Sequence, residues 1–547
     1  MKPIAARISL IIFTSVTSDL INHTKSKHRC SWKILRCRII HVRIAIHLAL
    51  NSHGSQIHEV AKRLNADISG DSEALVRDVT HDSRQAGQGT LFVAIKGATV
   101  DAHRFIDDVM RRGAVGVISE NGRPEAFSGI WLRVANARRS LAEAAAAVYN
   151  DPSHNIDLIG ITGTNGKTTT TYLCFSIAEA AGQTAAMLTT VEYRIGHSSE
   201  PAVRTTPEAS DTNRFLRRAV KEGCTVAVME TSSQAIDLHR CDGLRFKVAI
   251  FTNLTRDHLD YHGTMEQYFA AKKKLFDGSL GEVPYSSVIN IDDEWGARLA
   301  NELTASGKKV LTFSQKGQAD FKAANIEVSL ISGTTFQLRT PIGEILINSP
   351  LVGTPHVYNM LAATAASVEL GFGLESIKTA LAKCIGAPGR FERVPHEGDF
   401  AVVVDYAHTD DALLNILRTA RALTPGRIIT VFGCGGDRDR TKRQPMGEAA
   451  GSHSDHVIIT SDNPRSEDPL KIIGEIEIGV REKTRSYEAI PDRRDGIFRA
   501  IAIAQPGDLV IIAGKGHETY QIVGEEKFHF DDREIAAEAL DRKYADA

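Results

Sequence analysis

The sequence has 547 residues, enough for three or four folded units of about 150 residues each. Hydrophobic residues make up 42% and charged residues 24% of the chain, a composition typical of a globular protein with a buried core. The 65 Lys and Arg residues nearly balance the 67 Asp and Glu residues, giving a net charge of −2. No overall positive charge attracts nucleic acid or an anionic membrane, so we expect neither as a partner.

Two further features of the sequence restrict its location. The seven cysteines are scattered, without disulfide or metal-ligand spacing, which favours a reducing compartment and predicts a cytoplasmic protein. No apolar run reaches the roughly 18 residues of a membrane-spanning helix.

Residues 1–55 differ from the rest of the chain. Residues 1–50 carry nine Lys or Arg residues and one acid, Asp19. The apolar stretch 8–16 faintly resembles a signal peptide, but no small-residue cleavage site follows it. We interpret the segment as a disordered leader or a misassigned translation start, outside the predicted fold.

The next two segments alternate between helix and strand patterns. Residues 56–152 begin with helical spacing at 57–64, continue through a buried strand at 89–95, and end at an Asp-Pro turn. Residues 153–386 begin with an apolar strand at 156–162, followed by a glycine-rich turn and a helix. Such alternation predicts α/β domains with mostly parallel sheets.

The last segment, residues 387–547, has the pattern of a Rossmann-like α/β domain. Its short apolar strands are predicted at 400–405, 427–432, 456–460 and 509–513. The fold class predicted for the whole chain is therefore α/β, with three domains after the leader.

The most specific motif is Gly163-Thr-Asn-Gly-Lys-Thr-Thr169, between a predicted strand and a predicted helix. Backbone N–H groups and the helix N-terminus would bind phosphate, Lys167 would reach the β- and γ-phosphates, and Thr168 would bind Mg²⁺. Ile161 stands where the full Walker motif has glycine. The motif still predicts ATP and Mg²⁺ as cofactors and a P-loop-type ATPase as the central domain. The predicted ATP site includes Gly163, Thr164, Asn165, Gly166, Lys167, Thr168 and Thr169.

Two polar residues near the ends of predicted strands are candidates for a metal site. Glu230 ends one apolar strand, and His258 follows another. The carboxyl ends of parallel strands meet at one edge of the sheet, beside the phosphate loop. Taken alone, His258 is equally well explained as an ordinary polar residue. The lysine run 272–274 has the pattern of a solvated helix face.

Three loops of the last domain carry charged residues directly after predicted strands. They are Phe432-Gly-Cys-Gly-Gly-Asp-Arg-Asp439, Asp462-Asn-Pro-Arg465 and Gly514-Lys-Gly-His-Glu518. The guanidinium groups of Arg438 and Arg465 suit carboxylates, and Glu518 suits an ammonium group. Together they predict a site for a zwitterionic amino acid, although paired surface charges remain an alternative.

With these motifs together, the chain resembles the Mur ligases of bacterial cell-wall synthesis over about residues 56–540. The motifs that carry the resemblance are at 163–169, 253–262, 404–408, 433–439, 462–465 and 514–518. The likeness is to members that add meso-2,6-diaminopimelate to UDP-N-acetylmuramoyl-L-Ala-D-Glu. It implies an ATP-dependent, ADP-forming amide ligase that acts through an acyl phosphate in peptidoglycan precursor synthesis, as a monomer.

The resemblance also implies roles for the domains and for individual residues. Residues 56–152 would bind the UDP-sugar, 153–386 ATP, and 387–547 the amino acid. The UDP-sugar and dipeptide would contact His81, Ser83, Ala98, Thr99, Val100, Thr205, Thr206, Ser232 and Arg240. Diaminopimelate would contact Arg438, Asp462, Asn463, Pro464, Arg465, Gly514 and Glu518.

For the reaction itself, the resemblance implies that Lys272 is carbamylated and binds Mg²⁺ with Thr168, Glu230 and His258. The catalytic residues would be Lys167, Glu230, His258 and Lys272. Asn359 and Arg390 would contact ATP, with Asp405 and His408 nearby.

Two residues depart from the family pattern, and three alternatives remain. Asp410 stands where relatives often have proline, and Leu238 where they often have a polar residue. A folylpolyglutamate synthetase would lack a domain like residues 56–150. A lysine-adding Mur ligase would have no distal substrate carboxylate for Arg465 to bind. A P-loop regulatory module would have no use for the charged loops of the last domain.

Overall fold

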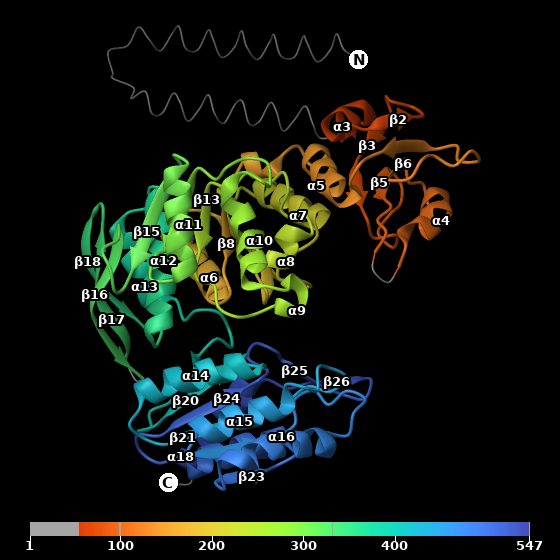
Figure 1. Cartoon of the computed structure of the whole chain (residues 1–547). Helices are drawn as coiled ribbons and strands as arrows, with labels where there is room; N and C mark the ends of the chain where they lie inside the picture. The colour runs from red at the N-terminus through yellow and green to blue at the C-terminus, as the bar shows by residue number, and fades with distance from the viewer. Residues whose placement is uncertain (1–53, 98–99, 331, 546–547) are drawn as a thin grey trace, which may run out of the picture.

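The computed structural model describes residues 54–97, 100–330 and 332–545 (Figure 1). Among these residues, strands form sheets of five, eleven and six strands and two small two-stranded sheets. Each large sheet takes its strands from one continuous stretch of chain, and most of its central neighbours are parallel. The predicted α/β class is confirmed, while the boundaries and roles assigned to the three domains stay predictions.

The first large sheet has the order β2-β7-β6-β5-β4, with β2 alone antiparallel to its neighbour. Its strands are β2 (Asp67–Ser69), β4 (Asp78–Thr80), β5 (Thr90–Val93), β6 (Gly116–Ser119) and β7 (Ile130–Arg133). Helices α3 (Ile57–Leu64) and α5 (Ala137–Val148) pack on one face, and α4 (Ile106–Arg111) on the other. Helix α3 coincides with the predicted helix.

Short elements complete this part of the chain. They are β1 (Ser55–Gln56), β3 (Leu75–Val76), the 3₁₀ turns η1 (Ala102–Phe105) and η2 (Pro152–His154). Helix α5 begins where the Asn136 side chain accepts a hydrogen bond from the backbone N–H of Arg139 at 3.0 Å. Arg214 then links this part to the central one, since its guanidinium donates to Tyr149 and Asp78, each at 3.0 Å.

The eleven-stranded sheet contains a parallel centre flanked by antiparallel strands. The parallel strands are β8 (Asp157–Thr162), β9 (Ala185–Leu188), β12 (Val226–Glu230), β13 (Val248–Phe251), β14 (Ser286–Asn290) and β15 (Val310–Ser314). At one edge, β10 (Glu192–Ile195) is antiparallel to both β9 and β11 (Ser198–Pro201). At the other edge, β16 (Phe321–Ser329) runs parallel to β15 and begins an antiparallel meander with β17 (Gly333–Thr340) and β18 (Gly343–Ser349). Sequence patterns did not predict these edge strands.

Successive residues of the parallel strands alternate between two cores because strand side chains point to opposite faces. One face packs against α6 (Lys167–Ala180), α12 (Thr354–Glu369) and α13 (Leu374–Lys383). The other packs against α7 (Ala209–Lys221), α8 (Ser233–Asp237), α10 (Met265–Asp277) and α11 (Glu294–Ala305). The short α9 (Leu259–His262) precedes α10. Helix α6 therefore begins directly after β8, at the carboxyl edge of the sheet.

The six-stranded sheet has the order β19-β20-β24-β21-β22-β23. Its last strand in the sequence, β24, lies in the middle of the sheet, between β20 and β21. Its strands are β19 (Glu392–Arg393), β20 (Ala401–Asp405), β21 (Ile428–Phe432), β22 (His456–Ile459), β23 (Tyr487–Ala489) and β24 (Leu509–Ala513). All but β19 run parallel, and β20, β21, β22 and β24 confirm the four predicted strands.

Helices cover both faces of this sheet. They are α14 (Asp410–Leu423), α15 (Arg443–His453) and α16 (Pro469–Lys483) on one face and α17 (Arg493–Ile503) and α18 (Asp532–Ala545) on the other. The hairpin β25 (Tyr520–Val523) and β26 (Glu526–His529) follows β24. Figure 1 shows this blue body beside the central one, with the first body beyond α7. No helix in the described ranges is long and apolar enough to cross a membrane.

Candidate functional site

The predicted phosphate loop lies between β8 and α6, where two positions require glycine. Gly163 has a φ of 147° and Gly166, which precedes the first residue of α6, a φ of 86°. A Cβ atom on Gly163 would lie 1.9 Å from Thr252 Oγ1, and one on Gly166 would lie 2.4 Å from Asn359 Oδ1. Both the backbone conformation and the close neighbours therefore exclude a side chain. The loop presents the N-terminus of a 14-residue helix, a suitable place for an anion.

The segment after β13 holds this loop in place. Asn253 accepts a hydrogen bond from the Asn165 N–H through Oδ1 at 2.9 Å and donates to its carbonyl through Nδ2 at 3.2 Å. Thr252 Oγ1 donates to the same carbonyl at 2.6 Å, and the Thr164 N–H donates to the Asn253 carbonyl at 2.9 Å. Sequence reasoning noted the motif containing Asn253 but missed this role. A polar residue directly after a buried strand was the available signal.

Two lysines converge on the carbonyl groups of the phosphate loop. Lys167 Nζ donates to the carbonyls of Gly163 and Thr164, both at 2.9 Å. Lys272 Nζ donates to the Gly163 carbonyl, also at 2.9 Å, and lies 4.5 Å from the centre of the Tyr268 ring. Burial lowers the pKa of Lys167, partly offset by the Glu230 carboxylate. Burial and the neighbouring Lys167 charge hold the pKa of Lys272 well below its usual value.

The lysine run at 272–274 is therefore only in part the solvated face that its pattern predicted. Lys273 is ion-paired with Glu302 at 2.7 Å and Lys274 with Asp237 at 2.8 Å, with side chains 35% and 39% exposed. Lys272, in contrast, is 1% exposed. Its burial against the phosphate loop separates it from its two neighbours.

The other predicted metal ligands lie in different surroundings. Glu230 is 1% exposed, and its Oε1 accepts hydrogen bonds from Thr190 N at 2.8 Å and Oγ1 at 3.2 Å. The His258 side chain is 48% exposed, 3.5 Å from Asp257. Thr168 lies in the first turn of α6. No group of three His, Cys, Asp or Glu side chains in the described chain is placed to hold a metal, and the predicted set has only two such residues.

These residues fit Mg²⁺ if Lys272 is carbamylated. The ion prefers oxygen ligands, which the Glu230 carboxylate and the Thr168 hydroxyl provide. An unmodified Lys272 offers none, but its lowered pKa favours the neutral amine, the form that reacts with carbon dioxide to give a carbamate. Carbamylation would convert this buried amine into a third source of oxygen ligands.

The residues predicted to bind the dipeptide lie together beside Glu230. Thr205 Oγ1 is 3.1 Å from Thr190 Oγ1. Thr206 Oγ1 donates to the Glu230 carbonyl at 2.8 Å and accepts from the Ser232 N–H at 3.1 Å. Arg240 donates to the Thr206 carbonyl at 3.2 Å. This cluster adjoins the phosphate loop because β12, which ends at Glu230, is paired with β8.

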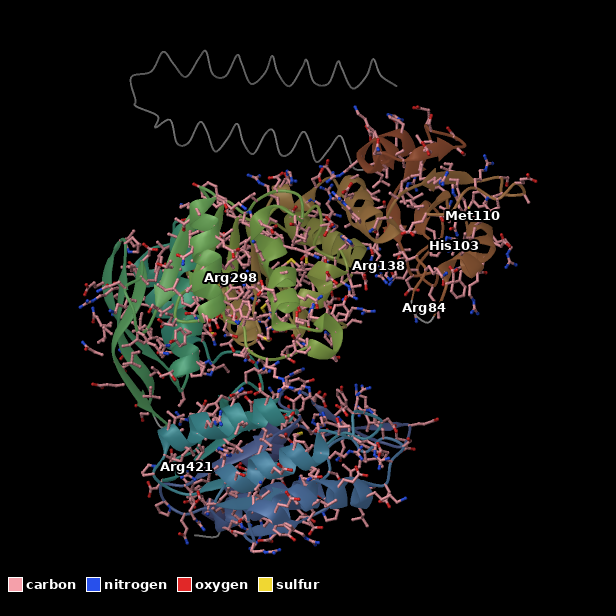
Figure 2. The ribbon with its side chains drawn as sticks, in the orientation of Figure 1. Arg84, His103, Met110, Arg138, Arg298 and Arg421 are labelled. Carbon is pink, nitrogen blue, oxygen red and sulfur yellow. The ribbon has the colours of Figure 1, made fainter. Side chains whose placement is uncertain are left out.

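Arg240 belongs to a positively charged region at the boundary with the first sheet. It is ion-paired with Glu208 at 2.8 Å, while burial and the charges of Arg204 and Arg138 lower its pKa. Figure 2 shows Arg138 between the first and central bodies. Leu238, two residues before Arg240, ends α8 and offers no polar group.

The predicted uridine-nucleotide residues lie on the first sheet. His81 follows β4, and its buried Nδ1 has no hydrogen-bond partner in the described part of the chain. The Ser83 carbonyl accepts a hydrogen bond from Arg112. Val100 is exposed, and Ala98 and Thr99 lie outside the described residues. An unpartnered buried nitrogen at His81 is a polar group available to a ligand.

Two further predicted ATP residues, Asn359 and Arg390, lie near the phosphate loop. Asn359, on α12, accepts a hydrogen bond from Thr170 Oγ1 at 3.4 Å and lies against Gly166. Arg390 is close enough to the phosphate loop for its charge to lower the pKa of Lys167. The Arg390 guanidinium lies 4.9 Å from the centre of the Tyr406 ring.

Asp405 fixes the backbone near Arg390. Its two carboxylate oxygens accept hydrogen bonds from the N–H groups of Phe391 at 2.7 Å and Ala407 at 2.8 Å. Burial raises the pKa of Asp405, with the Arg390 charge acting in the opposite direction. His408 lies next to this loop, its Nδ1 2.9 Å from the Tyr406 carbonyl, and Asp410 starts α14. Asp405 is thus a structural support for Arg390.

The residues predicted to bind diaminopimelate come together at the carboxyl ends of β21, β22 and β24. Asn463 Nδ2 donates to Glu518 Oε2 at 2.9 Å. Arg465 Nη1 donates to the Gly436 carbonyl at 2.7 Å, next to Arg438. Gly514 lies close to Asp462, since a Cβ on it would be 2.9 Å from Asp462 Oδ2. Pro464 and Asp462 line the same small recess.

Lys515 is a buried part of this cluster that sequence reasoning did not single out. Its Nζ donates to Asn463 Oδ1 at 3.3 Å and lies 3.4 Å from Glu518 Oε2 and 3.9 Å from Asp462 Oδ1. The side chain is fully buried. Its position inside the glycine motif 514–518 was the available signal. A buried cation here neutralises the two carboxylates and orients Glu518.

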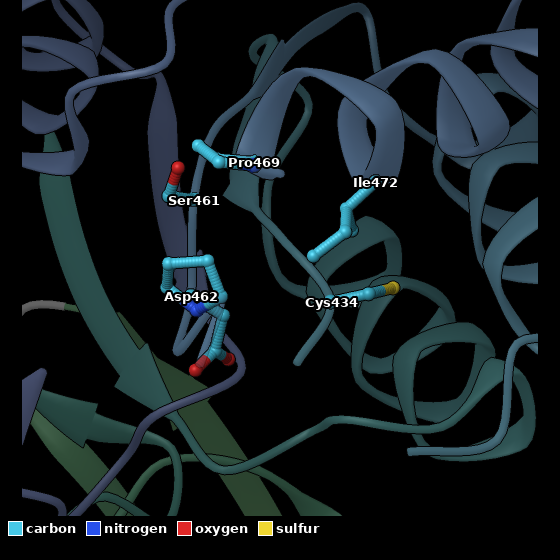
Figure 3. A pocket seen from close by; sticks show the side chains of 6 residues that line it. Cys434, Ser461, Asp462, Pro469 and Ile472 are labelled. Carbon is cyan, nitrogen blue, oxygen red and sulfur yellow. The ribbon is translucent and has the colours of Figure 1, made fainter. Parts of the chain in front are cut away.

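A small recess lies beside the loop 462–465 (Figure 3). Cys434 and Ile472 line it on the side of β21 and α16, opposite Ser461 and Asp462. Pro469, the first residue of α16, lies at its rim. Apolar packing at this point supports the base of the loop.

Comparisons with known proteins agree with this geometry. Residues 161–367 match the Mur ligase middle domain, and residues 389–516 match the Mur ligase glutamate ligase domain. A relative from Solibacter usitatus, named UDP-N-acetylmuramoyl-L-alanyl-D-glutamate--2,6-diaminopimelate ligase, is 47% identical over 85% of this chain and 93% of its own. A relative of the same name from Geobacter metallireducens is 45% identical over 89% and 98%.

A solved structure of a protein with that name is similar along almost the whole chain. It has a TM-score of 0.67 and 33% identity and covers 90% of this chain and 99% of its own. The family matches and the full-length relatives agree on one assignment. The chain belongs to the Mur ligase family.

Proposed function

We propose that the protein joins an amino group of meso-2,6-diaminopimelate to the D-glutamate carboxylate of UDP-N-acetylmuramoyl-L-Ala-D-Glu, converting ATP to ADP and phosphate. The relatives described above carry the name of this reaction. The observation that carries the proposal is the cluster of Arg438, Arg465, Asn463 and Glu518 around one sheet edge. Its charges match a ligand with an amino acid group and a distal carboxylate.

The nucleotide substrate would lie between the first two sheets. His81, Ser83 and the segment containing Val100 would bind its uridine end, while Thr205, Thr206, Ser232 and Arg240 would bind the dipeptide. The unpartnered Nδ1 of His81 and the positive region around Arg240 support this direction, since the nucleotide carries a pyrophosphate and the dipeptide a carboxylate.

ATP would lie on the phosphate loop, in contact with Asn359 and Arg390. The Lys167 ammonium, already directed at the loop, would neutralise charge on the transferred phosphoryl group. Thr168, Glu230, His258 and carbamylated Lys272 would hold Mg²⁺, which would supply positive charge against the phosphates of ATP. Carbamylation would add carbon dioxide to the neutral Lys272 amine, with loss of one proton.

The chemistry follows in two steps. A carboxylate oxygen of the dipeptide attacks the γ-phosphorus of ATP, the bond to ADP breaks, and an acyl phosphate forms. The neutral amine of diaminopimelate then attacks the acyl carbon, loses a proton, and displaces phosphate to leave an amide. Glu518 and Lys515 would orient the amino acid group, while Arg438 and Arg465 would bind carboxylate.

We also propose that the protein acts as a monomer in the cytoplasm. The cysteines within the described ranges, 174, 224, 241, 384 and 434, are all buried free thiols. Free thiols support a reducing compartment. Size-exclusion chromatography with light scattering would test the monomer, which a dimer mass would contradict.

One assay tests the proposed function directly. Phosphate release is measured with ATP, Mg²⁺ and UDP-N-acetylmuramoyl-L-Ala-D-Glu, adding diaminopimelate, L-lysine or L-glutamate in turn. We expect stoichiometric phosphate and ADP with diaminopimelate, much slower release with lysine, and none with glutamate. Equal or faster turnover with lysine would instead support a lysine-adding ligase. In a parallel assay, a folate replaces the nucleotide as acceptor, and activity with glutamate there alone would support a folylpolyglutamate synthetase.

A further inference from the structure

Two loops that carry the arginines of the amino-acid site are joined by a reciprocal set of hydrogen bonds. We call them the arginine loops, residues 433–439 after β21 and residues 461–468 before α16. Glu467 Oε1 accepts from the Asp437 N–H at 2.7 Å. Asp437 in turn accepts from the Ser466 N–H at 3.1 Å and from Ser466 Oγ at 2.7 Å. Each loop therefore supplies a carboxylate that binds the backbone of the other.

The backbones of the arginine loops are also in direct contact. The Gly436 N–H donates to the Asn463 carbonyl at 2.9 Å, and the Gly436 carbonyl accepts from Arg465. A Cβ on Gly436 would lie 1.9 Å from the Pro464 carbonyl oxygen, so any side chain there would force the loops apart. These contacts fix the distance between the backbones of the two arginine loops.

A buried arginine fixes Glu467 from behind. Arg443, on α15, is 1% exposed. Its Nη1 and Nη2 donate to the two oxygens of Glu467 at 3.0 Å and 2.8 Å, and Nη1 also donates to Glu475 at 2.8 Å. The bidentate geometry fixes the orientation of the Glu467 carboxylate as well as its position. Arg443 lowers the pKa of Glu467 to about 2, so the contact remains ionised throughout the physiological range.

The backbone at Arg465 and directly before Arg438 has an uncommon conformation. Asp437, directly before Arg438, has a φ of 53°, and Arg465, directly before Ser466, has a φ of 52°. Residues other than glycine adopt this left-handed conformation only where their surroundings impose it. The contacts between Asp437, Ser466 and Glu467 lie at these two positions. The Arg465 backbone is also held by β25 and the turn after it, through the Ile522 carbonyl at 3.1 Å and the Gly524 N–H at 2.8 Å. Together these contacts fix the backbone from which both arginine side chains leave.

We propose that Asp437 and Glu467 are positioning residues that set the separation of Arg438 and Arg465, and so select an amino acid with a distal carboxylate. The inference rests on the proposed function. The oxygens of both acids are occupied by the contacts above, so they act through the arginines and not on the substrate. Lysine, which lacks the distal carboxylate, makes no use of the separation.

The test uses the full-length protein and a matched pair of variants. Glu467→Gln keeps the shape of the side chain but loses the charged bidentate contact. Glu475, on α16 and outside the arginine loops, is the other carboxylate that Arg443 binds. Glu475→Gln therefore removes one negative charge from the same arginine. A displacement of about 1 Å costs on the order of 10- to 100-fold in a well-oriented reaction. We expect Glu467→Gln to raise KM for diaminopimelate at least about tenfold by the same principle, with KM for ATP and for the nucleotide unchanged.

The preference for diaminopimelate over lysine should fall by the same factor in Glu467→Gln and remain in Glu475→Gln. An equal effect of both variants, or a rise in all three KM values together, would overturn the inference. It would show that Arg443 serves stability alone.

A milder variant keeps the test valid if Glu467→Gln folds poorly. Ser466→Ala removes one hydroxyl from an exposed residue, and Asp437→Ala removes its acceptor. We expect each to raise KM for diaminopimelate, with the double variant no worse than Asp437→Ala, because both act through one contact. Unchanged KM values in both single variants would overturn the proposal. A wild-type protein that does not use diaminopimelate would contradict the proposed function itself, which this comparison therefore tests separately.

Discussion

Lys167 and Lys272 both donate a hydrogen bond to one carbonyl oxygen, that of Gly163, each at 2.9 Å. The two residues are 105 positions apart in the sequence and reach the oxygen from different helices, α6 and α10. Two ammonium groups so close together repel, and the pKa of Lys272 is the more strongly lowered. Burial and this repulsion both favour the neutral amine at Lys272, the form that carbamylation requires.

Replacing Lys167 by alanine should abolish most of the ligase activity without unfolding the protein. The ammonium contacts only loop carbonyls and would contact phosphate during the reaction. Loss of one such electrostatic contact costs about 10²–10³-fold in rate. Phosphate release at saturating substrates measures the loss, and circular dichroism checks the fold. Turnover within a few-fold of the wild type would rule out the proposed role of Lys167.

Replacing Lys272 by alanine should inactivate the enzyme, and a short carboxylate such as acetate should partly restore activity. The added carboxylate would take the place of the carbamate oxygens. Lys274→Ala is the matched control, because that lysine is ion-paired at the surface and should be dispensable. Intact-mass spectrometry under carbon dioxide should show one additional carbamate after trapping. An active enzyme whose Lys272 remains unmodified would refute the carbamate.

Replacing Arg465 by alanine should raise KM for diaminopimelate steeply and leave binding of ATP and of the nucleotide nearly unchanged. A charge-assisted hydrogen bond is worth up to about 3 kcal/mol, or roughly a hundredfold in KM. The slow reaction with lysine should change little, so the preference should shrink. Arg440→Ala, at a neighbouring surface ion pair with Glu475, is the control. If the variant keeps the wild-type preference, Arg438 becomes the residue that binds the distal carboxylate.

The buried His356 should make the protein less stable in mild acid. Burial lowers the pKa of His356 to about 4 from an ordinary value of 6.5. Below pH 6.5 the unfolded chain takes up a proton that the folded chain does not, so stability falls with pH until about pH 4. At pH 5 the loss is roughly 2 kcal/mol relative to pH 7.5.

Urea unfolding at the two pH values, for the wild type and for His356→Gln, measures this contribution. The variant should lose less stability between them by about that amount. An identical pH dependence in both proteins would show that His356 does not titrate differently on folding. The comparison also bears on the site, because His356 lies on α12, one turn before Asn359.

The phosphate loop, the α/β class and the four strands of the last domain could be predicted from the sequence because their signals are local. Glycines between an apolar strand and a helix indicate a loop with positive φ angles, because glycine adopts them without a steric cost. Gly163 and Gly166 both have positive φ. Apolar runs such as that of β24 mark buried parallel strands in the same way. These features depend on neighbours within a few residues.

The remaining features were decided only by the tertiary structure. A run of three lysines predicts a solvated helix face, but packing buried Lys272 against a loop more than 100 residues earlier in the chain. The antiparallel strands β16–β18 were not predicted, because their alternating burial depends on α13 covering one face. The contact between Asp437 and Glu467 likewise exists only because β21 and β22 are neighbours. Such contacts join distant residues whose pairing is set by strand order and helix packing, for which no local pattern gives a signal.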